Sequence, residues 1–408
     1  MILLKQLLAI SVVFFAFSVM AKSTIAANTS EPIIIGLDAD MSAVAAEGGQ
    51  AIQRGTEIAI HEINQAGGVL NRPLKLITTD HKGNPARGVD NLRELVENNN
   101  AVAVLSGVHT PVVLSQLPLI HKLEIPFLVP WAAGTPIIDN GYAPNYVFRL
   151  SVRDEYAGEF LLSEIKKTGI TDIALLLERT GWGRSNEKSV SQAAQKLDIN
   201  IHAIEWFHWG IDDFSNTLNR IQKTPTQALV LVANAPEGAV LVQNMANQPK
   251  NERLPIYSHW GITGGHFTSI AELKNIQKVD LLFLQTYSFL NPKTRNQTHQ
   301  NVLSLYRKLF DPAATAENLA SPVGIAHAYD LTHLLAQAIQ ATGSLDTSAI
   351  RDSLEQLQPY QGLVKHYQHA FSSTRHEALD RSNYILGSYS KEGFIVPHQR
   401  IADENDVE

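Results

Sequence analysis

The chain has 408 residues, enough for two domains of ordinary size, and 44% of them are hydrophobic, so a sizeable core can form. The formal net charge is −7, from 33 basic and 40 acidic residues, and this sign argues against binding to nucleic acid or to anionic membrane surfaces. The chain contains no cysteine, which excludes disulfides, a cysteine-linked lipid anchor, thiol catalysis and cysteine metal sites.

The first 27 residues are typical of a secretory signal peptide. Lys5 precedes an apolar run over residues 7–20 that is short for a bilayer span, and small residues follow at Ala21 and Ala27. Cleavage after either alanine would release an exported chain, and a retained N-terminal anchor is the alternative. Removal of residues 1–27 leaves 31 basic against 40 acidic residues. No later run is long and apolar enough to span, so we expect no membrane insertion after cleavage.

Strand and helix patterns alternate through residues 31–150. Short apolar runs predict strands at residues 31–37, 73–78, 101–105, 125–129 and 146–150; helices are predicted at residues 48–66 and 85–97, after Thr110 and after Thr135. Thr110 and Thr135 each precede a proline, which is typical of an N-cap followed by the first helical position. The loops 106–110 and 130–135 follow parallel strands, where open α/β sheets bind ligands, and two helix starts there would favour an anion.

The same alternation restarts after residue 150. Strands are predicted at residues 173–177, 202–206, 228–233, 256–259, 281–290 and 382–388, and helices at residues 156–168, 186–197, 214–222, 238–247, 297–310, 321–342 and 349–357. The loops 180–185, 234–237 and 260–265 follow strands of this half. No low-complexity linker separates the halves, so the sequence predicts two doubly wound parallel α/β lobes joined by a hinge.

No motif for catalysis or for a cofactor stands out. Residues 61–65 read HEINQ and lack the second histidine that a zincin needs, and the three histidines near residues 366–376 have no helix to align them. Phosphate-loop, GxSxG and dinucleotide patterns are missing. We therefore expect no metal, no cofactor and no catalytic residues. A hydrolase on the same fold is an alternative for which no nucleophile and base stand at a legible spacing.

Three of the five tryptophans fall in loops at the carboxyl ends of predicted strands. They are Trp131 in the first half and Trp182 and Trp260 in the second. Such rings could line a cleft between the halves and give flat apolar or cation–π contacts to a ligand. The alternative is that each packs against the edge of its own domain.

Several stretches resemble one family of binding proteins. They include DADMS, GGQAIQRGTEIAIHEINQAGG, AVLSGVHT, IPFLVPWAAGTP and LLLERTGWGRS, within residues 33–389. These resemble the periplasmic leucine/isoleucine/valine-type binding proteins, the type I solute receptors of ABC importers. The resemblance implies two Rossmann-like lobes joined by three crossings, with a small-molecule ligand closed between them. It also implies a periplasmic location, a monomer and an ABC transporter inner-membrane permease as partner.

On this reading the chain divides into four parts. The signal peptide is residues 1–27 and the tail is residues 401–408. The first lobe takes residues 32–151 plus about 285–355, and the second takes residues 152–284 plus about 356–400. A ligand-sensing partner of a membrane receptor is the alternative to a transport protein.

The resemblance also assigns ligand contacts, by position. The family's carboxylate-binding serine falls on Thr110, and its aromatic lid falls on Trp182. A further contact falls near Asn234, and the acid that usually receives the ligand ammonium falls on Trp260. The small-residue loop falls on Ala132, Ala133 and Gly134, preceded by the extra residue Trp131.

Tryptophan in place of that acid leaves the ligand open. An ammonium could instead meet Asp40, Glu47 or Glu237, or the faces of the tryptophans. A ligand without an ammonium, such as an aromatic acid, an amide or a urea-like solute, is the alternative. The family's disulfide positions hold Gly83 and His109, which makes His109 a candidate ligand contact or, alternatively, a residue packed beside the loop.

Overall fold

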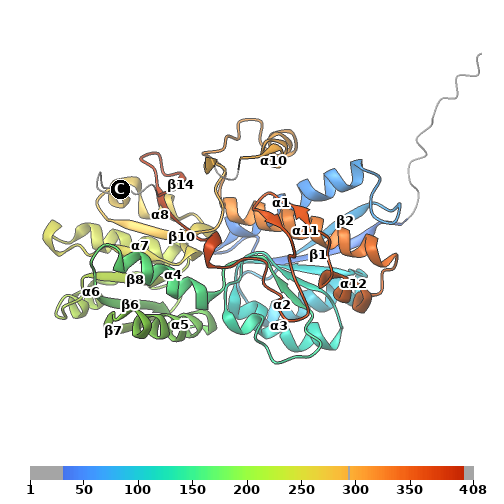
Figure 1. Ribbon diagram of the computed structural model, residues 1–408. Helices are drawn as coiled ribbons and strands as arrows, with labels where there is room; N and C mark the ends of the chain where they lie inside the picture. Colours follow the sequence, from blue (N-terminus) through green and yellow to red (C-terminus); the bar gives the residue numbers. More distant parts are fainter. Residues whose placement is uncertain (1–30, 293–294, 399–408) are drawn as a thin grey trace, which may run out of the picture.

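Two β-sheets, one built mainly from each half of the chain, organise the fold (Figure 1). The structure is a computed structural model, and it describes residues 31–292 and 295–398. The predicted signal peptide and the C-terminal tail lie outside the described residues.

The first sheet has five strands in the order β2-β1-β3-β4-β5, and all neighbours are parallel. Its strands are β1 (Ile33–Ala39), β2 (Leu74–Asp80), β3 (Ala103–Ser106), β4 (Phe127–Val129) and β5 (Val147–Arg149). Every residue of β3 and β4 is buried, which agrees with their sequences, apolar except for Ser106 at the end of β3. Helices α1 and α11 lie on one face of this sheet and α2 and α3 on the other (Figure 1).

The second sheet has seven strands in the order β14-β13-β10-β9-β8-β6-β7. Its strands are β6 (Asp172–Glu178), β7 (Asn200–Phe207), β8 (Ala228–Val232), β9 (Ile256–Ser258), β10 (Leu281–Gln285), β13 (Ile385–Tyr389) and β14 (Ile395–Pro397). Five neighbouring strands are parallel, in the order β7, β6, β8, β9 and β10, whereas β13 and β14 add an antiparallel edge. The predicted class, two α/β lobes built on parallel sheets, is confirmed.

The helices close to the first sheet are α1 (Ala46–Gln65), α2 (Pro85–Arg93), α3 (Thr110–Lys122), α10 (Gln297–Leu309), α11 (Pro322–Thr342) and α12 (Thr347–Leu354). Those of the second sheet are α4 (Asp154–Lys166), α5 (Gly181–Leu197), α6 (Ser215–Ile221), α7 (Ala235–Asn247), α8 (Phe267–Ala271) and α9 (Leu273–Ile276). Ile52 and Ala59, about two helical turns apart on one face of α1, are fully buried. A Cβ on Gly55 would lie 2.2 Å from the Ile325 carbonyl oxygen, so glycine is what lets α1 approach α11 so closely.

The helix predicted after Thr135 is wrong. Only a single 3₁₀ turn, η2 (Thr135–Ile137), forms there. The side chain of Asn140 donates to the Ile137 carbonyl oxygen, and Gly141 has a left-handed φ of 80°, so the chain turns away before a helix can propagate. The expectation of two helix starts facing a ligand is therefore wrong as well, and α3 supplies the one that remains in these two loops.

Two loops of the second half are in fact the first turns of helices. Thr180 caps α5 by accepting from the amides of Trp182 and Gly183, so Trp182 lies in the first turn of that helix. Asn234 is the N-cap residue of α7, and Glu237 lies in its first turn. Residues 260–264 likewise form the 3₁₀ segment η4 (Trp260–Gly264).

The chain passes between the two sheets three times. It leaves the first sheet after β5, returns after β10 to form α11, and joins the second sheet again at β13. Residues 360–379, assigned above to the second lobe, instead contact the first lobe. Asp330 of α11 accepts from the amides of Leu363 and Val364 at 2.6 and 2.9 Å, and His376 bonds to the Val147 carbonyl oxygen at 2.8 Å.

Candidate functional site

A small cavity lies where the carboxyl ends of both sheets face each other. From the first lobe it is lined by Val108, His109, Thr110, Pro111, Trp131 and Ala133. From the second lobe it is lined by Glu178, Trp182, Asn234, Trp260 and Gly261. Seven of these eleven residues are predicted contacts, and they come from five separate loops or helix starts. The position is the one at which open α/β sheets bind ligands.

The three predicted tryptophans meet at this cavity and nearly fill it. The rings of Trp131 and Trp260 reach across from opposite lobes, with centroids 5.2 Å apart, and each residue is 1% exposed. Trp182 packs edge-on against His259, with centroids 5.0 Å apart. The space left is about 10 Å³, which is room for about one water molecule. The described state is therefore closed, and its own indole rings occupy the cleft.

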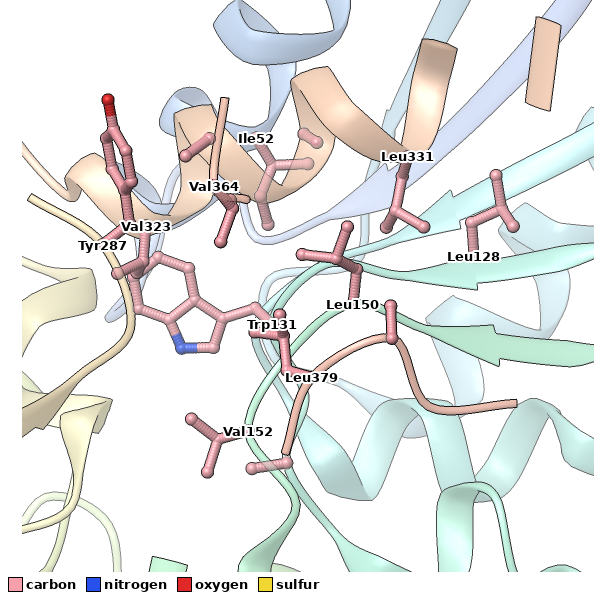
Figure 2. Packing of buried hydrophobic residues seen from close by; sticks show 14 of the residues in the cluster. Ile52, Leu128, Trp131, Leu150, Val152, Tyr287, Val323, Leu331, Val364 and Leu379 are labelled. Atoms are coloured by element: carbon pink, nitrogen blue, oxygen red, sulfur yellow. The ribbon is translucent and has the colours of Figure 1, made fainter. Parts of the chain in front are cut away.

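Trp131 also belongs to the core that joins the lobes. Figure 2 shows its indole reaching toward Val323 of α11 and Tyr287, with Val152 of the first crossing on the side of the indole nitrogen. That nitrogen is buried and has no hydrogen-bond partner in the described part of the chain. The carbonyl oxygen of Trp131 accepts from Ser151 at 2.5 Å, which fixes the backbone of the loop.

Asp40, a predicted ammonium acceptor, is already fully engaged. It is buried, and its carboxylate accepts from the amides of Ala43 at 2.7 Å and Ala45 at 3.0 Å. His109 places Nε2 at 3.1 Å from Oδ2. Burial acts to raise the pKa of Asp40, but the bonds from His109 and the two amides outweigh it and lower the pKa to about 2. The carboxylate is thus ionised at neutral pH, and His109 donates to it.

His109 rather than Thr110 is the N-cap residue of α3, so the predicted cap assignment is wrong. The Thr110 hydroxyl instead accepts from the Gly134 amide at 3.2 Å, because Gly134 lets the loop approach the helix: a Cβ there would lie 2.5 Å from Thr110 Cγ2. Gly83 lies against His109: a Cβ on Gly83 would lie 3.5 Å from Nε2 of His109.

The loop from Ala132 to Thr135 is held from both sides. The buried guanidinium of Arg149 donates to the carbonyl oxygens of Ala132 at 3.3 Å and Gly134 at 2.8 Å, and it pairs with Glu377. The Thr135 amide donates to the hydroxyl of Ser185 in the second lobe at 3.1 Å. In the closed state, the amides of Gly134 and Thr135 are thus bound by hydroxyl groups of the chain itself.

Glu178 is a charged residue of the cavity wall that was not among the predicted contacts. It ends β6, is fully buried, and lines the cavity. Its carboxylate accepts from Thr180 Oγ1 at 2.5 Å, Trp209 Nε1 at 2.8 Å and Asn234 Nδ2 at 2.9 Å. Burial, with added repulsion from Glu237 and Asp154, raises the pKa of Glu178 to about 7. An acid that ends a buried strand at the carboxyl edge was a signal visible in the sequence.

Two further acids lie behind the cavity wall. Glu237 accepts from the Gly210 amide at 2.9 Å through Oε1, and its Oε2 is buried without a partner. Asp154 accepts from Trp182 Nε1 at 3.1 Å through Oδ1, and its Oδ2 is also buried without a partner. Nε2 of His259 lies 3.1 Å from Asp154 Oδ1 but off the line of a hydrogen bond.

Two other residues differ from expectation. Glu47 lies outside the cavity and pairs with His266 of the second lobe at 2.6 Å, on the surface. Trp209, which no prediction included, crosses the cleft and places its ring 5.3 Å from that of His109. Of the predicted contacts, Asp40, Ala132, Gly134 and Glu237 support the cavity from behind rather than line it.

Within residues 31–292 and 295–398, no group of three or more His, Asp or Glu side chains is placed to hold a metal ion. No helix in the same ranges is long and apolar enough to cross a membrane.

Comparisons with known proteins agree with this fold. A sequence model of the family described as "Periplasmic binding protein" matches residues 32–386. An "Amino acid binding protein" of Pseudomonas aeruginosa is 23% identical over 248 residues, which is 60% of this chain and 63% of that protein, less than two thirds of its length. The "Leu/Ile/Val-binding protein homolog 1" of Brucella abortus is 20% identical over 337 residues, 81% of this chain and 84% of that protein.

Solved structures show the same fold. The branched-chain amino acid binding protein LivJ of Streptococcus pneumoniae, in complex with isoleucine, superposes with a TM-score of 0.76 at 20% identity, covering 90% of this chain and 100% of that one. A solute binding protein of an R. palustris ABC transporter, in complex with 4-hydroxybenzoate, has a TM-score of 0.75 at 17% identity, covering 90% and 95%. At these identities the likeness establishes the fold alone.

Proposed function

The chain belongs to the periplasmic binding protein family, and from this premise we propose that it is a solute receptor that closes its two lobes over a small polar organic ligand. Family members bind small molecules and work with ABC transporters. We propose that this chain is exported by its signal peptide, is a monomer, and delivers its ligand to an inner-membrane permease. The convergence of Thr110, Trp131, Trp182 and Trp260 from two lobes on one cavity is the observation that carries the proposal.

Receptor rather than enzyme is the role that the cavity favours. Thr110 carries the one hydroxyl group on the described cavity wall, and its oxygen accepts from the Gly134 amide. The histidine beside it, His109, donates to Asp40 and so is not positioned to take a proton from that hydroxyl. Binding would then act by stabilising the closed state.

The relatives name two ligand classes, branched-chain amino acids and aromatic acids. Trp260 replaces the acid that would receive an amino acid's ammonium, so a plain aliphatic amino acid would need another acid. We propose that Glu178, the acid on the cavity wall, receives that ammonium.

A thermal-shift screen tests the receptor role. The mature chain is unfolded, stripped of ligand, refolded, and heated with amino acids, amides, ureas, organic amines or aromatic acids. A saturating ligand that binds only the native state must raise the melting temperature, and calorimetry then checks each hit. Trp182→Ala should remove the shift while the control Trp206→Ala, on the edge strand β7 outside the cavity, should keep it. Hits that survive Trp182→Ala unchanged would place binding elsewhere.

A further inference from the structure

The cleft holds more buried acid than buried base. Asp40, Asp154, Glu178 and Glu237 are each at most 2% exposed, and all lie on or directly behind the cavity wall. Lys and Arg are absent from the described residues that line the cavity. Arg149, the nearest guanidinium to the loop from Ala132 to Gly134, is neutralised by Glu377. The field inside the closed cleft therefore favours positive charge.

Within the described residues, Glu178 and Glu237 have no Lys, Arg or His partner, whereas Asp154 lies 3.1 Å from Nε2 of the buried His259. Glu178 accepts from three neutral donors, on Thr180, Trp209 and Asn234. Oε2 of Glu237 and Oδ2 of Asp154 are buried and accept from nothing in the described chain. A buried carboxylate without a positive partner is costly, and a ligand cation would offset that cost. The raised pKa of Glu178, to about 7, is the response expected when that cation is missing.

The indole rings are turned to suit the same ligand. Trp182 directs its N–H at Asp154 and Trp209 directs its N–H at Glu178, at 3.1 and 2.8 Å. The N–H at the positive edge of each ring is therefore bound to an acid, and of the two rings Trp182 lines the cavity. Trp131 and Trp260 complete the wall from the two lobes. A cation within about 6 Å of such faces is attracted to them, and several together recognise alkylated ammonium groups.

The groups that would hold a carboxylate are, by contrast, engaged. The Gly134 amide binds Thr110, and the Thr135 amide binds Ser185 across the closed cleft. Gly261 packs against the Trp182 ring, where a Cβ would lie 2.5 Å from Cη2. With room for about one water molecule beside the rings, the ligand must be small and must displace part of an indole or hold the lobes slightly apart.

We infer that this cleft binds a small organic ammonium ion without a carboxylate, held between the faces of Trp131, Trp182 and Trp260 with Glu178 as its counter-charge. The inference rests on the proposed receptor function and narrows its ligand class. Alkylation of the nitrogen suits the site, because the described wall offers three indole rings and one carboxylate, that of Glu178, to the ligand.

Calorimetry and tryptophan fluorescence on the ligand-stripped mature chain test this. The probes are tetramethylammonium and methylammonium, the neutral shape mimic tert-butanol, and the carboxylates L-isoleucine and benzoate. We expect an ammonium probe to bind at least about tenfold more tightly than tert-butanol, with a change in fluorescence. Glu178→Gln should weaken this binding about tenfold or more. The control Glu252→Gln removes one charge from the exposed η3 (Lys250–Glu252) of the same lobe and should change it little.

Proton release gives a second readout. Because the pKa of Glu178 is about 7, a bound cation at pH 7 should drive a proton off this carboxyl group. Binding enthalpies measured in buffers of different ionisation enthalpy should then show net release for the native chain and less for Glu178→Gln. Should that variant fail to fold, Trp260→Phe, which keeps a ring face, should retain more ammonium binding than Trp260→Leu.

The possible outcomes separate the two proposals. Binding of L-isoleucine or benzoate with no ammonium binding overturns the inference but keeps the receptor function. Equal affinity for tert-butanol and tetramethylammonium, or equal binding by Trp260→Phe and Trp260→Leu, also overturns the inference. Failure of every compound in the broader thermal-shift screen, together with every probe here, contradicts the receptor function itself.

Discussion

Replacement of Glu178 by glutamine should change how stability depends on pH. Burial raises the pKa of Glu178 from 4.5 to about 7 in the folded chain. As the pH rises through this interval, the unfolded chain loses the proton first while the folded chain keeps it, so the native protein is progressively destabilised. This difference of about 2.5 between the two pKa values lowers the unfolding free energy by roughly 3 kcal/mol, and the loss is complete at pH values above 7. Glutamine does not titrate, so Glu178→Gln lacks this loss.

The assay is urea unfolding of both proteins at pH 4.5, 6, 7 and 8, followed by tryptophan fluorescence. The unfolding free energy of the native chain minus that of Glu178→Gln should fall by about 3 kcal/mol between pH 4.5 and pH 8. Asp38 and His327, whose burial shifts their pKa to about 7 and about 4, titrate in both proteins and cancel in the difference. If the difference in unfolding free energy between the two proteins does not vary with pH, the Glu178 carboxyl group is not buried without a cationic partner.

Three further substitutions probe the loops around the cavity. Arg149→Met should lower the unfolding free energy by about 3 kcal/mol, because the buried Glu377 keeps only the 3.3 Å contact with Arg153 and the loop carbonyl oxygens lose their donor. Trp131→Ala should cost about 3–5 kcal/mol, since it empties a site between the lobes that is 1% exposed. Thr110→Val removes the acceptor of the Gly134 amide and should cost about 1 kcal/mol, with little effect on the affinity for an ammonium probe. Urea unfolding measures all three.

Specific results would contradict these expectations. A loss below 1 kcal/mol for Arg149→Met would mean that the guanidinium does not hold the loop. An equally small loss for Trp131→Ala would mean that the cleft is open in the free protein. A large loss of ammonium affinity in Thr110→Val, with stability unchanged, would mean that this hydroxyl touches the ligand directly.

Much of this architecture was predictable because its signals are local. Buried parallel strands have continuous apolar sequence, and the loops after them must meet at one edge of a sheet. That rule alone placed Trp131, Trp182 and Trp260 together. The same rule also puts Glu178, which ends the run LLLE, at that edge of the sheet.

The errors arise where distant contacts decide. Proline after Thr135 is compatible with a helix, but the turn at Asn140 and Gly141 stops it after one 3₁₀ turn. Thr110 has the side chain of an N-cap residue, but its hydroxyl instead accepts a hydrogen bond from the amide of Gly134, 24 residues later in the chain. Trp209 reaches His109 only because the lobes close, and no local pattern reports such a contact.

The most direct test of the account measures the distance between the lobes. Because the native chain lacks cysteine, Asp90→Cys on α2 and Lys196→Cys on α5 give two unique sites for spin labels, both exposed and on different lobes. Electron paramagnetic resonance then yields the distance distribution with and without each compound that calorimetry shows to bind. The account predicts that such a ligand narrows this distribution about one separation of the lobes, because binding stabilises the closed state. An unchanged distribution at saturation would contradict capture between the lobes.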